Sequence, residues 1–296
     1  MHLKRSLALA TVAAALLVAC GDDTSASDDP PSSGEREAAS GPEAIVSLSP
    51  TATEMLFAIG AGDQVVAVDD QSDHPDDVPT TDLSGYEPNV EAIATYEPDL
   101  VVASDLPEDI TAGLEALDIE VLSIATATTL DDTYAQLADL GAATGHEEEA
   151  EELAATMRSD IDELVATVPD RDVAPTYYHE LDPTLYTATS DTFIGEIYSL
   201  AGLENVADPA DPDGSLGGYP QIAPEFLADA DPDYVFLADG ECCGEDADTF
   251  AARPGFADLT AVAEEHIVLL DEDVASRWGP RVVELLETII DATAPA

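Results

Sequence analysis

The sequence contains very few basic residues. It has eight Lys and Arg residues against 64 Asp and Glu residues, which gives a formal net charge of -56 at pH 7. A nucleic-acid-binding protein needs a basic face that neutralises phosphates, so nucleic acid is excluded as a main partner. Lys4 is the only lysine, which also excludes a phosphate-binding loop of the Gly-Lys-Ser/Thr type.

Aromatic residues are scarce as well, with nine Tyr, six Phe and one Trp. The hydrophobic fraction of 45% is nevertheless ordinary for a globular protein, so the chain is not a disordered acidic tail. Its 296 residues are enough for one large domain or two modest ones. Residues 60–62 begin a dinucleotide-binding glycine pattern but lack its third glycine, and residues 213–217 resemble a nucleophile elbow but lack its first glycine. We therefore do not expect an enzyme.

Residues 1–19 have the pattern of a secretory signal peptide. Lys4 and Arg5 precede an apolar stretch that is too short to span a bilayer as a typical helix. The segment Leu17-Val-Ala-Cys20-Gly resembles a bacterial lipobox, whose Cys is lipidated before cleavage; an ordinary cleavage site with a chance Cys is the alternative. We expect lipidation at Cys20, a flexible acidic tether over 20–42, and a location at the extracytoplasmic face of the cell membrane.

Beyond the tether, short apolar runs alternate with helical patterns. Ser49 and Pro50 predict a helix start, with Ser49 as N-cap and Pro50 at the first helical position. The alternation predicts an α/β fold with mostly parallel sheets. The strands are expected at 44–48, 64–68, 99–103, 119–123, 175–179, 185–188, 233–238 and 266–270.

One long helical pattern interrupts this alternation. Residues 146–169 place Leu153, Met157 and Ile161 at helical spacing, and Pro169 ends the pattern. It divides the chain into an N-terminal α/β lobe, 43–145, and a C-terminal α/β lobe, 170–296. We therefore expect two lobes joined by one long helix.

The two halves share an internal echo. Glu91 to Val101 and Glu225 to Val235 carry Glu, Ala, Pro-Asp and Val at the same offsets. Convergence on a common helix-turn-strand sequence is one explanation. The other is two equivalent lobes, each exposing a Glu at the same place.

Several segments together resemble a known family. Ile45-Val-Ser-Leu-Ser-Pro-Thr-Ala-Thr-Glu54, Asn89-Val-Glu91, Pro98-Asp-Leu-Val101, Tyr219-Pro-Gln-Ile-Ala-Pro-Glu225 and Arg277-Trp-Gly-Pro-Arg281 are similar to segments of substrate-binding lipoproteins of ABC importers for cobalamin and iron-siderophores. The resemblance implies two Rossmann-like lobes joined by one rigid helix, as in class III periplasmic binding proteins. It implies a monomer without cofactor that captures an iron complex (siderophore or haem) or a corrinoid and delivers it to the permease subunits. A free Zn or Mn binding protein and a secreted hydrolase on a similar fold are the alternatives.

The resemblance also implies site residues. Glu91 and Glu225 would dock on the transporter. Tyr side chains suit a macrocycle or a catechol ring, and Arg277 could pair with an anionic group of the ligand. Small residues stand at Gly85 and Ser104, where cobalamin binders carry Trp. The expected ligand-binding residues are Gln71, Gly85, Tyr86, Ser104, Asp105, His179, Tyr186, Tyr219, Asp273 and Arg277.

The histidines and cysteines leave alternatives open. His179 could ligate haem or a metal, or be a hydrogen-bonded residue at a strand end, and His74 is typical of a turn. Cys242 and Cys243 predict a vicinal disulfide in an oxidising compartment, with free thiols or a metal site as alternatives. Neighbouring Cα atoms lie about 3.8 Å apart, below the usual disulfide range of roughly 4.4–6.8 Å, so we expect an easily reduced bond.

Salt should stabilise this protein. The Debye length falls from about 10 Å at 0.1 M to about 3 Å at 1 M salt, which weakens repulsion among the 64 acidic side chains. The thermal midpoint should therefore rise between 0.1 and 1 M KCl. A flat or falling midpoint in a calorimetric scan would contradict this expectation.

Overall fold

The computed structural model describes residues 41–295, so the predicted signal peptide, Cys20 and nearly all of the tether lie outside the described residues. Residues 41–295 form one unit by their mutual contacts. Within 41–295, no helix has the length and apolar character needed to cross a membrane.

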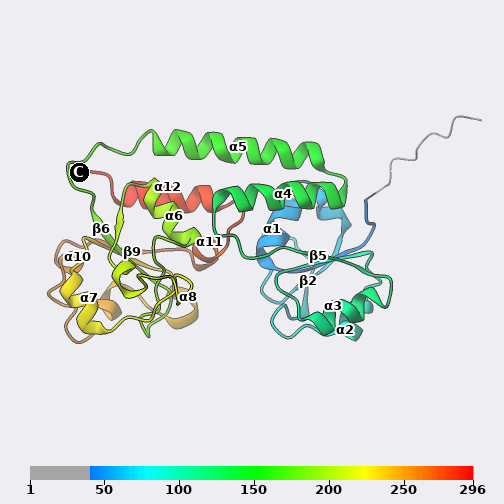
Figure 1. The fold of residues 1–296 in the computed structure, drawn as a ribbon, viewed down its shortest axis with the longest axis horizontal. Helices are drawn as coiled ribbons and strands as arrows, with labels where there is room; N and C mark the ends of the chain where they lie inside the picture. The colour runs from blue at the N-terminus through cyan, green and yellow to red at the C-terminus, as the bar shows by residue number, and fades with distance from the viewer. Residues whose placement is uncertain (1–40, 296) are drawn as a thin grey trace, which may run out of the picture. The chain divides into compact units, whose positions relative to one another are not determined.

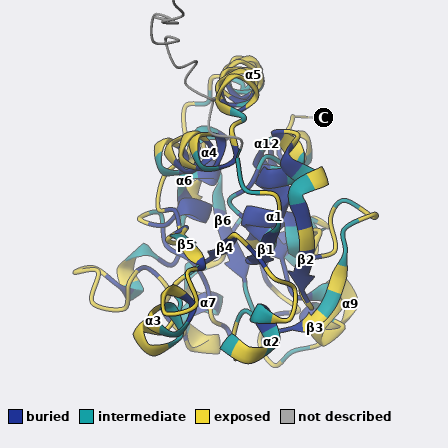
Figure 2. Ribbon diagram, turned by 90° about the vertical axis from the view of Figure 1, so that its right-hand side faces the viewer, coloured by how far each residue is buried: buried dark blue, intermediate teal, exposed yellow. Residues whose placement is uncertain are grey.

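The first half builds a five-stranded parallel sheet in the order β3-β2-β1-β4-β5, and Figure 2 shows its strands side by side. Apolar side chains point to both faces of the central strands, so helices cover both faces. The strands are β1 (Ile45–Leu48), β2 (Val65–Asp69), β3 (Thr80–Leu83), β4 (Leu100–Ala103) and β5 (Glu120–Ser123). The helices are α1 (Pro50–Ala58), α2 (Val90–Ala94), α3 (Glu108–Glu115) and α4 (Leu130–Thr144), with a 3-10 turn at Ala61–Gln64.

The second half builds a four-stranded parallel sheet in the order β7-β6-β8-β9. Its strands are β6 (Thr176–Glu180), β7 (Glu204–Asn205), β8 (Tyr234–Leu237) and β9 (Ile267–Leu269). Its helices are α6 (Phe193–Leu200), α7 (Pro224–Ala230), α8 (Gly240–Cys243), α9 (Ala247–Ala251), α10 (Thr260–Ala263), α11 (Glu272–Ser276) and α12 (Val282–Ala292), with a 3-10 turn at Asp208–Ala210. The predicted α/β class with two parallel sheets is confirmed.

Most predicted strands are found within one residue of their expected bounds. The strand expected at 185–188 is wrong, because this segment makes only isolated bridges, between Glu180 and Thr187 and between Tyr186 and Gln221. Strands β3 and β7 were not predicted, because β3 is a largely exposed edge strand and β7 has two residues. The predicted cap of α1 is confirmed, since the Ser49 hydroxyl accepts a hydrogen bond from the Ala52 N–H at 3.4 Å.

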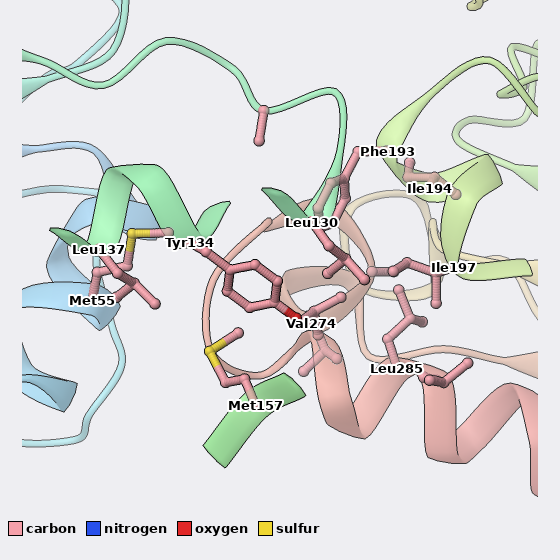
Figure 3. Packing of buried hydrophobic residues seen from close by; sticks show 14 of the residues in the cluster. Met55, Leu130, Tyr134, Leu137, Met157, Phe193, Ile194, Ile197, Val274 and Leu285 are labelled. Carbon is pink, nitrogen blue, oxygen red and sulfur yellow. The ribbon is translucent and has the colours of Figure 1, made fainter. Parts of the chain in front are cut away.

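The helix between the two sheets, α5 (Glu147–Val165), packs against α4 and α12 rather than standing alone (Figures 1 and 2). Ala150, Ala154, Met157 and Ile161 form its buried stripe. These residues belong to one hydrophobic cluster that also contains side chains of β1 in the first sheet and of β6 in the second. Figure 3 shows Met157 of α5 near Tyr134 of α4, with Ile197 of α6 and Leu285 of α12 in the same cluster. A continuous core therefore connects the two halves.

The internal echo has a structural counterpart. Glu97 and Asp231, at the same offset in the two segments, both adopt a left-handed backbone, with φ of 51° and 45°. The Asp99 carboxylate accepts hydrogen bonds from the N–H groups of Glu43 and Ala44, just before β1. The Asp233 carboxylate likewise accepts bonds from the N–H and hydroxyl of Thr176, at the start of β6. Both Asp residues therefore fix the start of a neighbouring strand, so the repeated segments have the same structural role in the two halves.

Candidate ligand-binding site

The candidate site consists of the loops at the carboxyl ends of the strands in both sheets, where open α/β sheets bind ligands. Asp273 follows β9, and Tyr186 lies beyond the end of β6. In the first sheet, Gln71 follows β2, Gly85 and Tyr86 follow β3, and Ser104 and Asp105 follow β4. These seven predicted residues are thus spread over the same edge of each sheet. Two hollows on the surface of residues 41–295, one beside Gly60 and Pro79 and one beside Arg158 and Glu196, are lined by other residues.

Three tyrosines present aromatic surface at these edges. The exposed fraction is 88% for Tyr86, 42% for Tyr186 and 39% for Tyr219. The bridge between Tyr186 and Gln221 holds the segments that carry Tyr186 and Tyr219 side by side. An exposed tyrosine offers an apolar ring face and a hydroxyl group, so this edge can stack on a planar ligand and hydrogen-bond its rim.

Gly85 is required by a close approach of the backbone. A Cβ atom at this position would lie 2.6 Å from the Leu48 carbonyl oxygen and 2.9 Å from Asp69 Oδ2. No side chain fits here, which gives a physical reason for the small residue. At the other small position, the Ser104 hydroxyl donates to the Ser49 hydroxyl at 3.1 Å, so Ser104 supports the start of α1.

Arg277 is occupied by protein groups. It is only 9% exposed, and its two terminal nitrogens donate to the Gln71 carbonyl and to three carboxylates. The distances are 2.9 Å to Glu54, 3.0 Å to Asp73, 2.6 Å to Asp273 and 3.1 Å to the Gln71 oxygen. The expected pairing of Arg277 with an anionic ligand therefore needs correction: Arg277 connects elements of the two halves.

Glu54 is the centre of this arrangement. It lies on α1, is buried, and accepts bonds from Arg277 at 2.9 Å and from Arg281 at 3.0 and 2.5 Å. Two guanidinium groups satisfy both carboxylate oxygens, which is the condition for a tolerable buried charge. We call Glu54, Asp73, Asp273, Arg277 and Arg281 the interlobe ion cluster. Sequence reasoning placed Glu54 and the two arginines in family segments, but nothing in the sequence indicates contact across more than 220 positions.

The two aspartates of the interlobe ion cluster have opposite pKa shifts. Burial, together with the neighbouring Asp73 carboxylate, raises the pKa of Asp273 to about 6 although Arg277 and Arg281 oppose this. Burial would also raise the pKa of Asp73, but the hydrogen bond and charge of Arg277 lower it overall. Asp273 is thus the member of the pair that takes up a proton first.

His179 lies in the core of the second half. Its exposed fraction is 0%, its Nδ1 lies 2.8 Å from the Tyr198 hydroxyl, and burial lowers its pKa to about 4. The imidazole is therefore neutral and enclosed, and the structure does not place it where a ligand could reach it. This matches the hydrogen-bonded alternative rather than the ligand-binding expectation.

A second group of carboxylates lies at the end of β6 and β8. Glu180 is buried and accepts hydrogen bonds from both terminal nitrogens of Arg253, at 2.8 and 2.5 Å. Arg253 also forms an ion pair with Glu245 at 2.9 Å. Asp239 is fully buried, and neither of its carboxylate oxygens has a hydrogen-bond partner. The pKa of Asp239 is raised to about 7, mainly because the group is buried and also because the Glu180 and Glu245 carboxylates repel its charge. No motif or spacing in the sequence pointed to this group.

Cys242 and Cys243 are bonded to each other on α8, immediately beyond β8, and both residues are exposed. Glu91 and Glu225 are exposed in the first turns of α2 and α7, at equivalent places in the two halves. Over the described range 41–295, no three His, Cys, Asp or Glu residues are grouped so as to hold a metal ion.

No arginine of residues 41–295 is left to meet an anion at this site. Arg277 and Arg281 are bound to Glu54, and Arg253 is bound to Glu180. Of the remaining two, Arg171 donates to the Thr293 carbonyl, and Arg158 lies on α5 with its guanidinium 3.8 Å above the Tyr134 ring. The site therefore offers carboxylates, hydroxyls and tyrosine rings, but no available positive charge.

Residues 45–274 match the family model described as periplasmic binding protein. The cobalamin-binding protein of Halobacterium salinarum is 31% identical over 268 residues, which cover 86% of this chain and 70% of that protein. An uncharacterized ABC transporter substrate-binding lipoprotein of Bacillus subtilis is 29% identical over 263 residues, covering 86% of this chain and 81% of the relative.

Solved structures agree with this match. The periplasmic haem-binding protein of Vibrio cholerae has a TM-score of 0.76 and 25% identity, with coverage of 85% of this chain and 98% of that one. The periplasmic vitamin B12-binding protein of Vibrio cholerae has a TM-score of 0.68 and 25% identity, with coverage of 85% and 96%. These relatives are solute-binding proteins, and the fold is the class III type that the family resemblance implied.

The Asp239 carboxyl should make stability depend on pH. Because its pKa is raised from 3.8 to about 7, the folded state holds this proton more tightly than the unfolded state does. The stability contributed is complete below about pH 3.8 and is lost as the pH rises through about 7. Asp239→Asn keeps the shape without ionising, so it should raise the thermal midpoint at pH 8 by about 2–4 °C or more and change it far less at pH 4.5.

The matched control is Asp229→Asn, because Asp229 is an exposed carboxylate on α7. Its midpoint should equal that of the parent protein at both pH values. Equal midpoint shifts for Asp239→Asn at pH 4.5 and pH 8 would show that the buried carboxyl does not titrate in this range.

Proposed function

Because the chain belongs to the periplasmic binding protein family, we propose that it is an extracytoplasmic, lipid-anchored solute-binding protein, not an enzyme, that captures a corrinoid and delivers it to an ABC importer. The ligand lies between the carboxyl ends of the two sheets. The lipid on Cys20 keeps the protein at the cell membrane, beside the permease subunits. The residues 43–145 and 170–296 act as the two ligand-holding lobes.

The observation that carries the choice of ligand is the engagement of every arginine in 41–295 by protein groups. Haem presents two propionates and tricatecholate iron complexes are strongly anionic, and such groups are costly to desolvate without a cation. Repulsion from the net charge of -56 adds to that cost. Anionic ligands are therefore disfavoured.

A corrinoid suits the same surface better. Its rim carries amide N–H donors, which the carboxylates and hydroxyls at the strand ends accept, and its macrocycle offers a face for Tyr186 and Tyr219. The Asp105 and Asp273 carboxylates are at least partly exposed there. The cobalamin-binding relative at 31% identity supports the same ligand class.

Haem is the second candidate. The haem-binding structure with a TM-score of 0.76 favours it, as do the exposed tyrosine hydroxyls, since a tyrosine oxygen can ligate haem iron. In that case Tyr86, Tyr186, Tyr219 or His74, which is exposed in the loop after β2, would supply the iron ligand, because His179 is enclosed.

A binding panel separates the two ligands. Calorimetric titration with cyanocobalamin, haemin and a ferric tricatecholate should give the tightest binding for cyanocobalamin, by about 100-fold, or roughly 2.7 kcal/mol. Tyr219→Ala should weaken that binding about tenfold through loss of ring contact. Tyr96→Ala is the control, because Tyr96 is also exposed but precedes β4, at the opposite end of the sheet.

Tighter binding of haemin than of cyanocobalamin would replace the corrinoid with haem. Unchanged affinity in Tyr219→Ala, together with unchanged affinity in Tyr186→Ala, would remove this edge as the ligand site. Binding of free Zn²⁺ in preference to all three complexes would favour the metal-ion alternative.

Docking on the importer is assigned to Glu91 and Glu225. Each is exposed at the start of a helix, one in each lobe, and can pair with an arginine on one permease subunit. Glu91→Ala with Glu225→Ala should leave ligand affinity unchanged and reduce transporter ATP hydrolysis about tenfold, or roughly 1.4 kcal/mol. The control pair Glu115→Ala with Glu204→Ala removes equal charge from other exposed positions. Full stimulation of the transporter by the first double variant would refute the docking role.

A further inference from the structure

The vicinal disulfide has no part in the proposed ligand binding or docking. Cys242 and Cys243 are both exposed on α8, a helix of four residues between β8 and Gly244. Apart from Cys20, they are the only cysteines in the sequence. An exposed disulfide can be attacked by an external thiolate, whose access depends on the groups around the sulfurs.

The two sulfurs differ in their surroundings. The Cys242 sulfur lies 3.7 Å from the carbonyl oxygen of the buried residue Asp239, which covers it on one side. The Cys242 N–H donates to the Glu272 carboxylate of α11 at 2.9 Å, which holds this residue against the protein. An attacking thiolate therefore reaches Cys243 more readily than Cys242.

Carboxylates dominate the charge around this bond. Glu241 precedes Cys242, Glu272 contacts its N–H, and Glu245 and Asp246 follow the pair by two and three residues. The nearest cation in the sequence is Arg253, whose guanidinium is bound to Glu180 and Glu245. A thiolate that also carries a negative group must enter this field against repulsion.

We propose that Cys242–Cys243 is a site of thiol–disulfide exchange that accepts thiols on uncharged or positively charged molecules and discriminates against anionic thiols. The thiolate of the donor attacks the Cys243 sulfur, a mixed disulfide forms, and the bond to Cys242 breaks. Cys242 leaves as a thiolate and takes a proton from solvent. A second donor thiol then attacks the mixed disulfide, releasing Cys243 as a thiol and the donor as its disulfide, so two electrons and two protons pass to the protein.

Thiols of equal length and different charge test this selection. Cysteamine, 2-mercaptoethanol and 2-mercaptoethanesulfonate carry a positive, neutral and negative group on the same two-carbon chain. The folded full-length protein is incubated with each thiol, quenched with N-ethylmaleimide, and weighed intact to count the alkylated cysteines. Each rate constant is corrected for the fraction of the added thiol that is ionised. It is then divided by the rate constant of the same thiol with a small uncharged disulfide, which removes differences in intrinsic reactivity.

At 0.1 M KCl, cysteamine should react about tenfold faster than 2-mercaptoethanesulfonate, which corresponds to roughly 1.4 kcal/mol from a few carboxylates at contact distances. At 1 M KCl the ratio should fall to about threefold or less, because the Debye length shrinks to about 3 Å. At 0.1 M KCl, Glu241→Gln and Glu272→Gln should each lower the ratio of the cysteamine rate to the 2-mercaptoethanesulfonate rate. Glu287→Gln, on α12, should leave this ratio unchanged.

Equal corrected rates for the three thiols, or a ratio that is independent of salt, would overturn the charge selection. Failure of all three thiols to open the bond in the folded protein, with two cysteines alkylated only after unfolding, would overturn the exchange site itself. Two alkylated cysteines before any thiol is added would show that the bond does not form. The Cys242→Ser with Cys243→Ser variant gives the baseline, including any adduct on Cys20.

Discussion

Glu54 holds two arginines that come from the other half of the chain, and the arrangement of the candidate site depends on this contact. Arg277 and Arg281 approach α1 from the segment after α11, and Arg277 also binds Asp73 and the Gln71 carbonyl in the loop after β2. The strand-end loops of the two sheets are thereby fixed relative to each other. The hydrophobic cluster that includes side chains of α1, α4, α5, α11 and α12 supports the same relation between the halves. A second link, from the Leu130 N–H to Glu196 of α6, also joins the two halves.

The scarcity of positive charge connects the fold to the ligand. The described part of the chain has five arginines, and all five make contacts within the protein. Three of these arginines form ion pairs with the buried carboxylates of Glu54 and Glu180. Breaking such a pair would leave a buried charge uncompensated, which is strongly destabilising. The protein therefore cannot lend these arginines to an anionic ligand without loss of stability. A neutral ligand that donates hydrogen bonds fits this constraint, and the same surplus of carboxylates governs access to the disulfide on α8.

The features that the sequence predicted correctly are mostly local ones. The cap at Ser49, the helical stripe with Met157 and Ile161, and the repeated Pro-Asp turns are short-range features, and all of them appear in the structure. Strand β3 was not predicted because an exposed edge strand has no apolar run. Residues 185–188 were wrongly predicted as a strand because an apolar-polar run of four residues also suits an ordered loop. The role of Arg277 and the enclosure of His179 depend on partners distant in the sequence, namely Glu54 and Tyr198, so composition and spacing could not reveal them.

The most direct measurement is a double-mutant cycle between Glu54 and Arg277. Glu54→Gln, Arg277→Met and the double variant are unfolded by urea at 0.1 M KCl, and the free energies of unfolding are compared. The account predicts a coupling free energy of about 2 kcal/mol or more, whereas Glu54→Gln with Arg158→Met, on α5, should be additive within about 0.5 kcal/mol. Additivity of Glu54→Gln and Arg277→Met within that margin would contradict the claim that this ion cluster holds the two halves together.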